Sequence, residues 1–110
     1  MGLTKTAQFT DLQNKKAIIF KALGHPARVA IIEYIITQKT CICNDLVDTL
    51  PLSQATISQH LKELKAAKII KGTIEGNSLC YCLNPELLIE IKLIIEQYID
   101  RVEENESPCC

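Results

Sequence analysis

The stretch SQATISQHLKELKAAK, residues 53–68, has the pattern of an amphipathic helix. Ile57, Leu61 and Leu64 recur at helical spacing and predict a buried face. Ser53 is suited to cap the N-terminus, because its hydroxyl can accept a hydrogen bond from a free backbone N–H. The segment NDLVDTL, residues 44–50, predicts a shorter helix, which Pro51 ends. Two short helices joined by a tight turn indicate a helix-turn-helix.

The residues that follow this helix change to a composition typical of strands. KIIKGTIE at 68–75 and SLCYCL at 78–83 flank Gly76-Asn77, the dipeptide expected in a tight hairpin loop. A β-hairpin directly after a helix-turn-helix forms a winged helix. The sequence therefore predicts a mainly α fold with one small β-hairpin.

Two more helices are predicted ahead of this unit. The first covers roughly 11–23, and Gly24 suits its C-terminal cap. The second, PARVAIIEYIIT at 26–37, begins with Pro26, whose missing N–H would have no helical partner there. Helical spacing predicts inward positions for Ile19, Phe20 and Leu23 in the first helix, and for Val29, Ile32 and Ile36 in the second.

The last predicted helix, residues 85–104, carries more apolar residues than one small domain can cover. Its apolar stripe consists of Leu87, Leu88, Ile91, Ile94, Ile95, Tyr98, Ile99 and Val102. A stripe this wide needs a partner surface. We therefore expect a two-fold homodimer built on the first and last helices. Burial within a monomer is the alternative.

Length and composition predict one domain over residues 1–110. The chain is 47% hydrophobic, unlike a disordered protein. It shows no signal-peptide pattern and no apolar run long enough to cross a bilayer. We expect a soluble cytoplasmic protein that binds no membrane, with a flexible cysteine-bearing tail at 105–110. In a reducing compartment, its six cysteines are expected to be metal ligands or reactive thiols rather than structural disulfides.

Charge is unevenly distributed, although the net charge is only −1. Residues 53–72 carry four lysines against Glu63, a net charge of +3. Residues 86–106 carry seven acidic residues against Lys92 and Arg101, a net charge of −5. This distribution predicts one face turned towards phosphate and one turned away. An ordinary solvated helix face would give the same charges, so the pattern alone does not decide.

The outward face of the helix at 53–68 suits double-stranded DNA. Gln59 can hydrogen-bond adenine at two atoms, and small side chains can contact the thymine methyl. Lys62 and Lys65 can hold phosphates. His60, beside the buried face, is expected to pack there or to touch phosphate rather than to bind a ligand. The predicted DNA-binding residues are Gln54, Ala55, Thr56, Ser58, Gln59, Lys62, Lys65 and Lys71 at the base of the hairpin.

Together these segments resemble the ArsR/SmtB family of bacterial metal-responsive repressors. The matching stretches are FKALGHPARVAIIEYI, CICNDLVDTL, LSQATISQHLKELKAAKII and the hairpin through YCLN, and they cover most of residues 18–84. The resemblance implies a winged-helix homodimer that binds operator DNA when empty. It also implies release from the operator, and hence derepression, when a metal or metalloid ion binds.

The resemblance extends to the thiols of TCICNDL, residues 40–46. In the arsenic-responsive branch a CxC motif at this helix start supplies thiolates, and Cys41 and Cys43 resemble that pair. Thiolates favour soft ions such as trivalent arsenic or antimony. Residues two apart on an ideal helix point about 200° away from each other. One ion can therefore hold both sulfurs only if this turn is distorted, which would disturb the packing against the reading helix.

The chain departs from the usual arsenic motif at Leu46, where a third cysteine is common. Cys109 and Cys110 are the preferred source of the missing sulfur, whereas a methylated arsenical would need only two sulfurs. The predicted metal ligands are thus Cys41, Cys43, Cys109 and Cys110. Cys80 and Cys82 share one strand face, where small apolar filler is favoured over a ligand role.

Two other features of the family are missing. The last helix has no histidine, because the chain's two are His25 and His60. This disfavours the zinc site that family members form from Asp and His across the dimer. The arginine often found near the wing tip is absent from EGNS, residues 75–78, which counts against minor-groove contact.

Alternatives remain for the signal and for the function. The same cysteines could oxidise to disulfides, bind persulfide or take another soft metal ion. A thiol oxidoreductase is disfavoured, because no βαβ pattern with a CxxC motif is present. An interaction module without DNA binding would leave the outward face at 53–68 unexplained. We therefore predict a non-enzymatic repressor that requires no cofactor and is released by As(III) or Sb(III).

Overall fold

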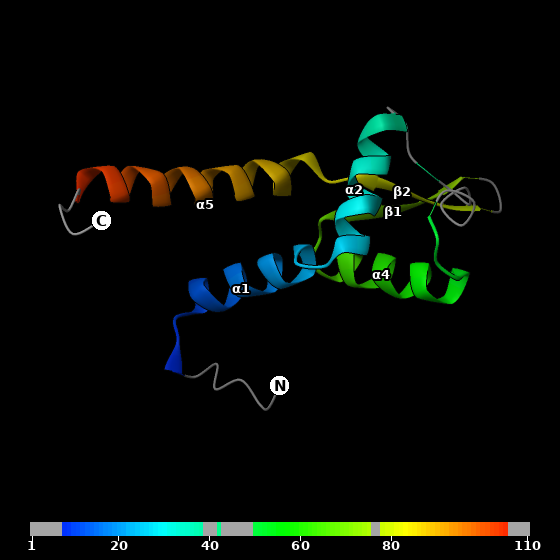
Figure 1. Cartoon of the computed structure of the whole chain (residues 1–110), viewed down its shortest axis with the longest axis horizontal. Helices are drawn as coiled ribbons and strands as arrows, with labels where there is room; N and C mark the ends of the chain where they lie inside the picture. Colours follow the sequence, from blue (N-terminus) through cyan, green and yellow to red (C-terminus); the bar gives the residue numbers. More distant parts are fainter. Residues whose placement is uncertain (1–7, 39–41, 43–49, 76–77, 106–110) are drawn as a thin grey trace.

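The structure, a computed structural model, describes residues 8–38, 42, 50–75 and 78–105. The helix expected at 44–50, except for its last residue Leu50, and the loop dipeptide Gly76-Asn77 lie outside these ranges. The winged-helix architecture is confirmed, and α1 and α5 have the predicted ends (Figure 1). The elements are α1 (Asp11–Leu23), α2 (Pro26–Gln38), α4 (Gln54–Ala66), β1 (Ile70–Glu75), β2 (Ser78–Leu83) and α5 (Pro85–Glu104).

The core forms where α4 packs against α2. Ile57, Leu61 and Leu64 of α4 are buried, as predicted. They belong to one apolar cluster with Ile31 and Ile35 of α2. Burial of this face fixes the rotation of α4 about its own axis and turns its polar side outward.

The predicted inward face of α2 was wrong. Val29 and Ile36 are 43% and 57% exposed, whereas Ile31 and Ile35 are buried and Ile32 is half-buried. Isoleucines stand in adjacent pairs at 31–32 and 35–36, so helical spacing fits more than one face. Contacts of α2 with α4 and β2 select the face that carries Ile31 and Ile35.

The C-terminus of α4 is capped by backbone hydrogen bonds, and the residue with positive φ in this cap is a lysine rather than a glycine. Lys68 adopts a left-handed conformation with φ of 64°. Its N–H donates to the Lys65 carbonyl at 2.9 Å, and the Ile69 N–H donates to the Leu64 carbonyl at 3.0 Å. These two bonds form a Schellman motif, in which a residue with positive φ lets the chain reverse after a helix. Ile69 and Leu64 are both fully buried, which holds the turn against the core.

The hairpin pairs β1 with β2 in antiparallel register from Ile70↔Leu83 to Glu75↔Ser78. Both edges of β2 have a backbone neighbour at Tyr81, because Gly72 lies opposite on one side and Ile42 on the other. The wing is therefore joined to the chain segment that precedes the helix-turn-helix.

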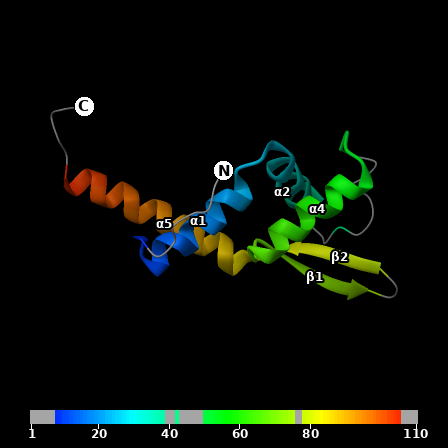
Figure 2. The same cartoon turned by 90° about the horizontal axis from the view of Figure 1, so that it is seen from below.

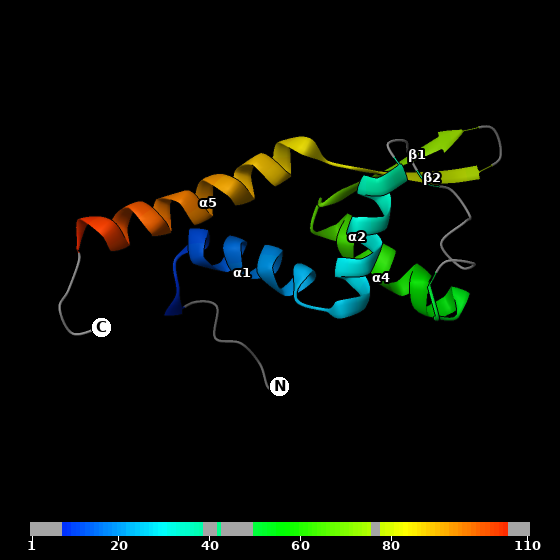
Figure 3. The same ribbon diagram turned by 45° about the horizontal axis from the view of Figure 1, so that its top comes forward.

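Helices α1 and α5 extend together away from this body, as Figures 1 and 3 show. Seen from below, the hairpin and the free end of α5 lie at opposite ends of the molecule (Figure 2). The radius of gyration is 17.0 Å, whereas a compact chain of this length would have about 13 Å. The shape is elongated because these two helices project from the core.

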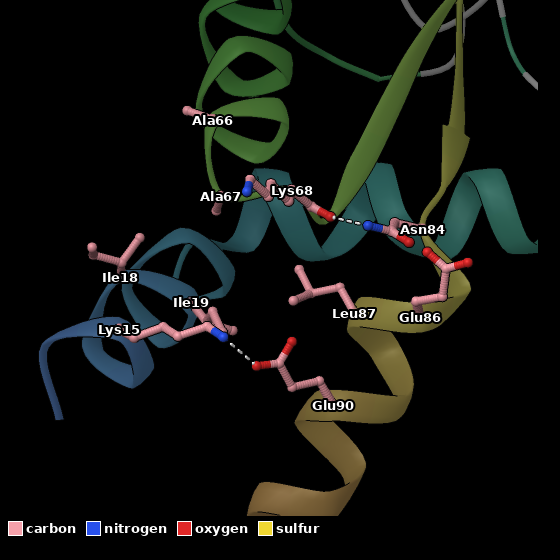
Figure 4. Close-up of a pocket in the computed structure, with 10 residues that line it drawn as sticks. All are labelled: Lys15, Ile18, Ile19, Ala66, Ala67, Lys68, Asn84, Glu86, Leu87 and Glu90. Carbon is pink, nitrogen blue, oxygen red and sulfur yellow. Dashed lines mark hydrogen bonds and ion pairs between the residues drawn. The ribbon is translucent and has the colours of Figure 1, made fainter. Parts of the chain in front are cut away.

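The two projecting helices meet the body near the end of α4. Ile19 of α1 and Leu87 of α5 are buried at this junction and approach Ala67 (Figure 4). The Lys15 ammonium forms an ion pair with the Glu90 carboxylate at 2.8 Å. An exposed pair of this kind contributes little stability, so packing at the junction is the main intramolecular tie between these helices.

Candidate nucleic-acid interface and cysteine positions

The outer face of α4 carries the predicted DNA-reading residues. All seven are exposed, and they come from one continuous helical surface: Gln54, Ala55, Thr56, Ser58, Gln59, Lys62 and Lys65. Ser53 caps the helix as predicted, because its hydroxyl accepts a hydrogen bond from the Thr56 N–H at 3.3 Å. The arrangement presents amide, hydroxyl and ammonium groups on a rigid element, as recognition of base edges and phosphates requires.

Three of the predicted residues already have side-chain partners, and one of these contacts joins the hydroxyl oxygens of Thr56 and Ser53 at 3.0 Å. The Gln59 amide nitrogen donates to a Glu63 carboxylate oxygen at 3.2 Å. The Lys71 ammonium lies 3.9 Å from a carboxylate oxygen of Glu86, at the start of α5. A base contact by Gln59 would therefore replace one intrahelical hydrogen bond, and Lys71 lies beside α5 as well as at the base of the hairpin.

The inner side of α4 is held by a residue that the sequence analysis did not identify. Arg28 of α2 donates from Nε to Nδ1 of His60 at 3.2 Å. Its Nη1 donates to the carbonyl oxygen of Ala22, at the end of α1, at 3.3 Å. Arg28 thereby links three helices. No local pattern marks this residue, because its partners lie in elements distant along the chain.

His60 packs against the body, in agreement with the packed alternative for this residue. It is buried, and its ring centroid lies 4.4 Å from that of His25. Burial of the imidazole, together with the charges of His25 and Arg28, lowers the pKa of His60 below its ordinary value. The neutral form fits the geometry, since Nδ1 must accept the hydrogen bond from Arg28.

The predicted metal ligands Cys41, Cys43, Cys109 and Cys110 lie outside the described residues. Cys80 is fully buried and Cys82 is half-buried on β2. Burial agrees with the filler role, but both side chains are also disulfide-bonded. Composition alone had favoured free thiols or ligands over disulfides. Within the described ranges, no three His, Cys, Asp or Glu side chains are grouped as a metal site would need.

A large apolar surface remains on the projecting helices. Only Leu87 and Ile94 of α5 are buried. The exposed apolar residues of α1 and α5 are Leu12, Ile18, Ile89, Leu93, Ile95, Tyr98, Ile99 and Val102. Among the described helices, none has the length and apolar character needed to cross a bilayer.

Comparison with known proteins agrees with this architecture. A family model described as bacterial regulatory protein, arsR family, matches residues 25–71. The transcriptional repressor SmtB of Mycobacterium tuberculosis is 37% identical over 75 residues, which are 68% of this chain and 55% of SmtB. The chain thus spans about half the length of that relative.

Two further likenesses extend over more of both chains. The arsenical resistance operon repressor of Staphylococcus xylosus is 31% identical over 91 residues, which are 83% of each protein. The crystal structure of Rv0081 from Mycobacterium tuberculosis is 26% identical, with a TM-score of 0.64, over 88% of this chain and 97% of that one. The curated relatives are named as regulators, which supports the expectation that the chain is not an enzyme. The chain belongs to the arsR family of bacterial regulatory proteins.

Proposed function

We propose that this protein is a transcriptional repressor that binds operator DNA through α4 and the hairpin. The observation that carries this function is the outward face of α4. Buried Ile57, Leu61 and Leu64 hold the helix in place, while Gln59 and Lys62 point away from the core. A second helix of a helix-turn-helix reads the major groove with such side chains.

The DNA assignment is tested with Gln59→Ala and Lys62→Ala. The probe is a duplex that the wild-type protein selects from a random pool, and binding is measured by gel shift at several salt concentrations. Lys62→Ala removes one phosphate contact, so it should weaken binding to all DNA sequences alike. The slope of the logarithm of the binding constant against the logarithm of salt concentration should become shallower by about 0.9. Gln59→Ala should weaken the selected duplex by roughly 1–3 kcal/mol and relax its specificity.

Lys92→Ala is the matched control, because it removes an exposed lysine on α5 whose ammonium pairs with Glu96. It should bind DNA as the wild type does. Normal DNA binding by both α4 variants, with folding and assembly intact, would refute the assignment.

We further propose that the repressor acts as a homodimer formed by α1 and α5. The support is the row of apolar side chains that these helices leave exposed. A two-fold dimer would bury this row and place two copies of α4 on successive half-sites of one operator.

Release from DNA is proposed to follow binding of As(III) or Sb(III) to Cys41 and Cys43. The support is the CxC spacing ahead of the helix-turn-helix, together with a relative named as an arsenical resistance operon repressor. Cys109 and Cys110 are the source of the third sulfur that the sequence favours. Thiol oxidation, persulfide or another soft ion acting on the same cysteines is the second candidate.

The inducer is tested by adding arsenite to the reduced protein–DNA complex. Arsenite should release the wild type, whereas Cys41→Ser and Cys43→Ser should stay bound. Peroxide should have no effect if the ion is the signal. Release of both variants at wild-type arsenite concentrations would reject these thiols as the sensor.

A further inference from the structure

Arg28 joins the reading helix α4 to α1, the helix that projects towards the proposed dimer partner. Its Nε donates to Nδ1 of His60 on α4 at 3.2 Å. Its Nη1 donates to the carbonyl oxygens of Ala22 at 3.3 Å and of Lys21 at 3.5 Å, both in the last turn of α1. The last carbonyls of a helix have no partner within the helix, so they are free to accept such bonds. One planar guanidinium therefore holds a side chain of α4 and the backbone of α1 in a fixed relation.

Packing alone restrains the angle between α1 and α4 only weakly. Ile19 and Ala22 are the only buried residues of α1. Two grooves, of about 340 and 270 Å³, border the contact between the helices, and Ala66 and Ala67 at the end of α4 line both (Figure 4). Apolar contact is not directional, so small side chains beside open grooves fix the distance between two helices better than their angle. The directional hydrogen bonds of Arg28 supply that restraint.

The α4 end of this link is itself held in place. The His60 side chain is buried, and its ring centroid lies 4.4 Å from that of His25. Nδ1 of His25 accepts a hydrogen bond from the Ala27 N–H at 3.0 Å, which fixes that ring to the start of α2. Because Nδ1 of His60 accepts from Arg28, the proton of the neutral ring lies on Nε2. Rotation of the imidazole would leave a half-buried charged donor without this partner, which is costly.

The two ends of the link have different partners in the proposed repressor. α1 carries the exposed side chains of Leu12 and Ile18 into the proposed dimer interface, whereas α4 carries the predicted DNA-reading residues. A two-fold dimer reads two half-sites whose centres lie about 34–36 Å apart, or a multiple of that distance. The angle between α1 and α4 in each chain therefore sets the separation and the relative orientation of the two reading helices.

We propose that Arg28 is a positioning residue that determines which spacing of operator half-sites the dimer accepts, because it locks α4 to α1 through His60 and the Ala22 carbonyl. This inference rests on the repressor and the dimer proposed above. It deepens them, since it names the group that sets specificity for half-site spacing rather than for individual bases. In this arrangement Arg28 acts through α4 rather than on DNA directly.

Half-site spacing is tested with variants of the duplex that the wild-type protein selects from a random pool. One base pair inserted or deleted at the centre shifts the half-sites by about 3.4 Å and turns them by about 35° relative to each other. The wild type should bind these duplexes about tenfold or more weakly than the selected one, and Arg28→Ala should narrow the ratio to less than about threefold. Equal ratios for the two proteins, both dimeric by sedimentation, would overturn the proposal.

Further variants separate the position of Arg28 from its charge. Arg28→Lys keeps the charge but replaces the planar fork by a point charge, so spacing selectivity should fall as in Arg28→Ala. Lys21→Ala is the matched control, because it removes an exposed cation and leaves the Lys21 carbonyl in place. His60→Asn keeps an acceptor as many bonds from the backbone as Nδ1 and should retain selectivity, whereas His60→Leu should lose it. Full selectivity in Arg28→Lys or in His60→Leu would show that the link is dispensable.

The link is also tested in the free protein, without DNA. Nitrogen-15 spectra of the histidine rings should show His60 with a protonated Nε2 and an unprotonated Nδ1. The Nδ1 resonance should move in Arg28→Ala, because the charged donor is lost. A His60 ring protonated on Nδ1 at neutral pH would refute the link whether or not the protein binds DNA. A wild-type protein that selects no duplex would instead refute the proposed function, and the spacing role with it, while the hydrogen bonds of Arg28 would stand.

Discussion

Helices α4 and α5 are both amphipathic, yet they use their apolar faces in opposite ways. α4 buries Ile57, Leu61 and Leu64 against its own chain. α5 is longer, and buries only Leu87 and Ile94 there. The same sequence pattern therefore leads to a buried core face in one helix and to an exposed apolar face in the other. The difference shows that an apolar stripe predicts burial without saying which chain supplies the partner.

Truncation of the α4 core should have the largest effect. Leu64 is fully buried in the apolar cluster, so Leu64→Ala removes packing contacts there and leaves a cavity. The expected loss is about 2.7–5 kcal/mol of unfolding free energy, measured by urea denaturation. Leu93→Ala on α5 is the matched control, because Leu93 is half exposed. At concentrations that keep the protein monomeric, an equal loss in the two variants would contradict the contrast between the helices.

A charge on the exposed stripe of α5 should separate the dimer and leave the fold unchanged. Ile99→Glu adds a carboxylate to the apolar row in each of two chains. An unpaired charge in a buried interface is expected to cost roughly 2–3 kcal/mol, which raises the dimer dissociation constant about 30- to 150-fold. Sedimentation equilibrium measures the constant, and Glu103→Gln on the same helix is the control. If the wild-type protein stays monomeric at high micromolar concentration, the proposed interface is refuted.

The sequence predicted the elements where local signals agree. Ser53, the spacing of Ile57 and Leu61, and the alternation along β2 each fix one element without reference to the rest of the chain. The sequence did not predict the inward face of α2, because adjacent isoleucines fit two faces and only contact with α4 and β2 selects one. Arg28 was missed for a related reason, since the partners of its side chain belong to α1 and α4.

The candidate site also combines features that local sequence signals predict with features that depend on distant contacts. The exposed face of α4 follows from helical periodicity, so the predicted DNA-binding residues could be placed on it without the structure. The bridge between Ile42 and Tyr81 was not found. It is a contact between positions far apart in the chain. Local spacing in the sequence carries no information about such a pairing.

The burial of His60 on the inner side of α4 makes the stability of the fold depend on pH. Its folded pKa is lowered by burial and by the charges of His25 and Arg28, whereas the unfolded histidine titrates near 6.5. Below that pH the unfolded chain binds a proton that the folded chain does not, so the free energy of unfolding falls as pH is lowered. The fall is at most about 1.4 kcal/mol per pH unit for one group, and it ends below the folded pKa.

His60→Gln retains an acceptor for Arg28 and removes the titration. Urea denaturation of both proteins between pH 7.5 and about 5 measures the difference. The variant should lose less stability than the wild type over this range. Parallel pH profiles would show that the imidazole does not carry the effect.

The smallest expected effect concerns the turn that ends α4. Lys68 holds a left-handed conformation with φ of 64°, which costs a residue with a side chain roughly 1–2 kcal/mol relative to glycine. Lys68→Gly removes that strain, but it also gives the unfolded chain more freedom, an opposing contribution of about 0.4–1 kcal/mol. A net gain of about 0.5–1 kcal/mol in unfolding free energy should remain. Lys65→Gly, inside the helix, should instead cost roughly 0.5–1 kcal/mol. The two substitutions remove the same side chain three residues apart, so opposite signs would isolate the backbone conformation at Lys68 as the cause.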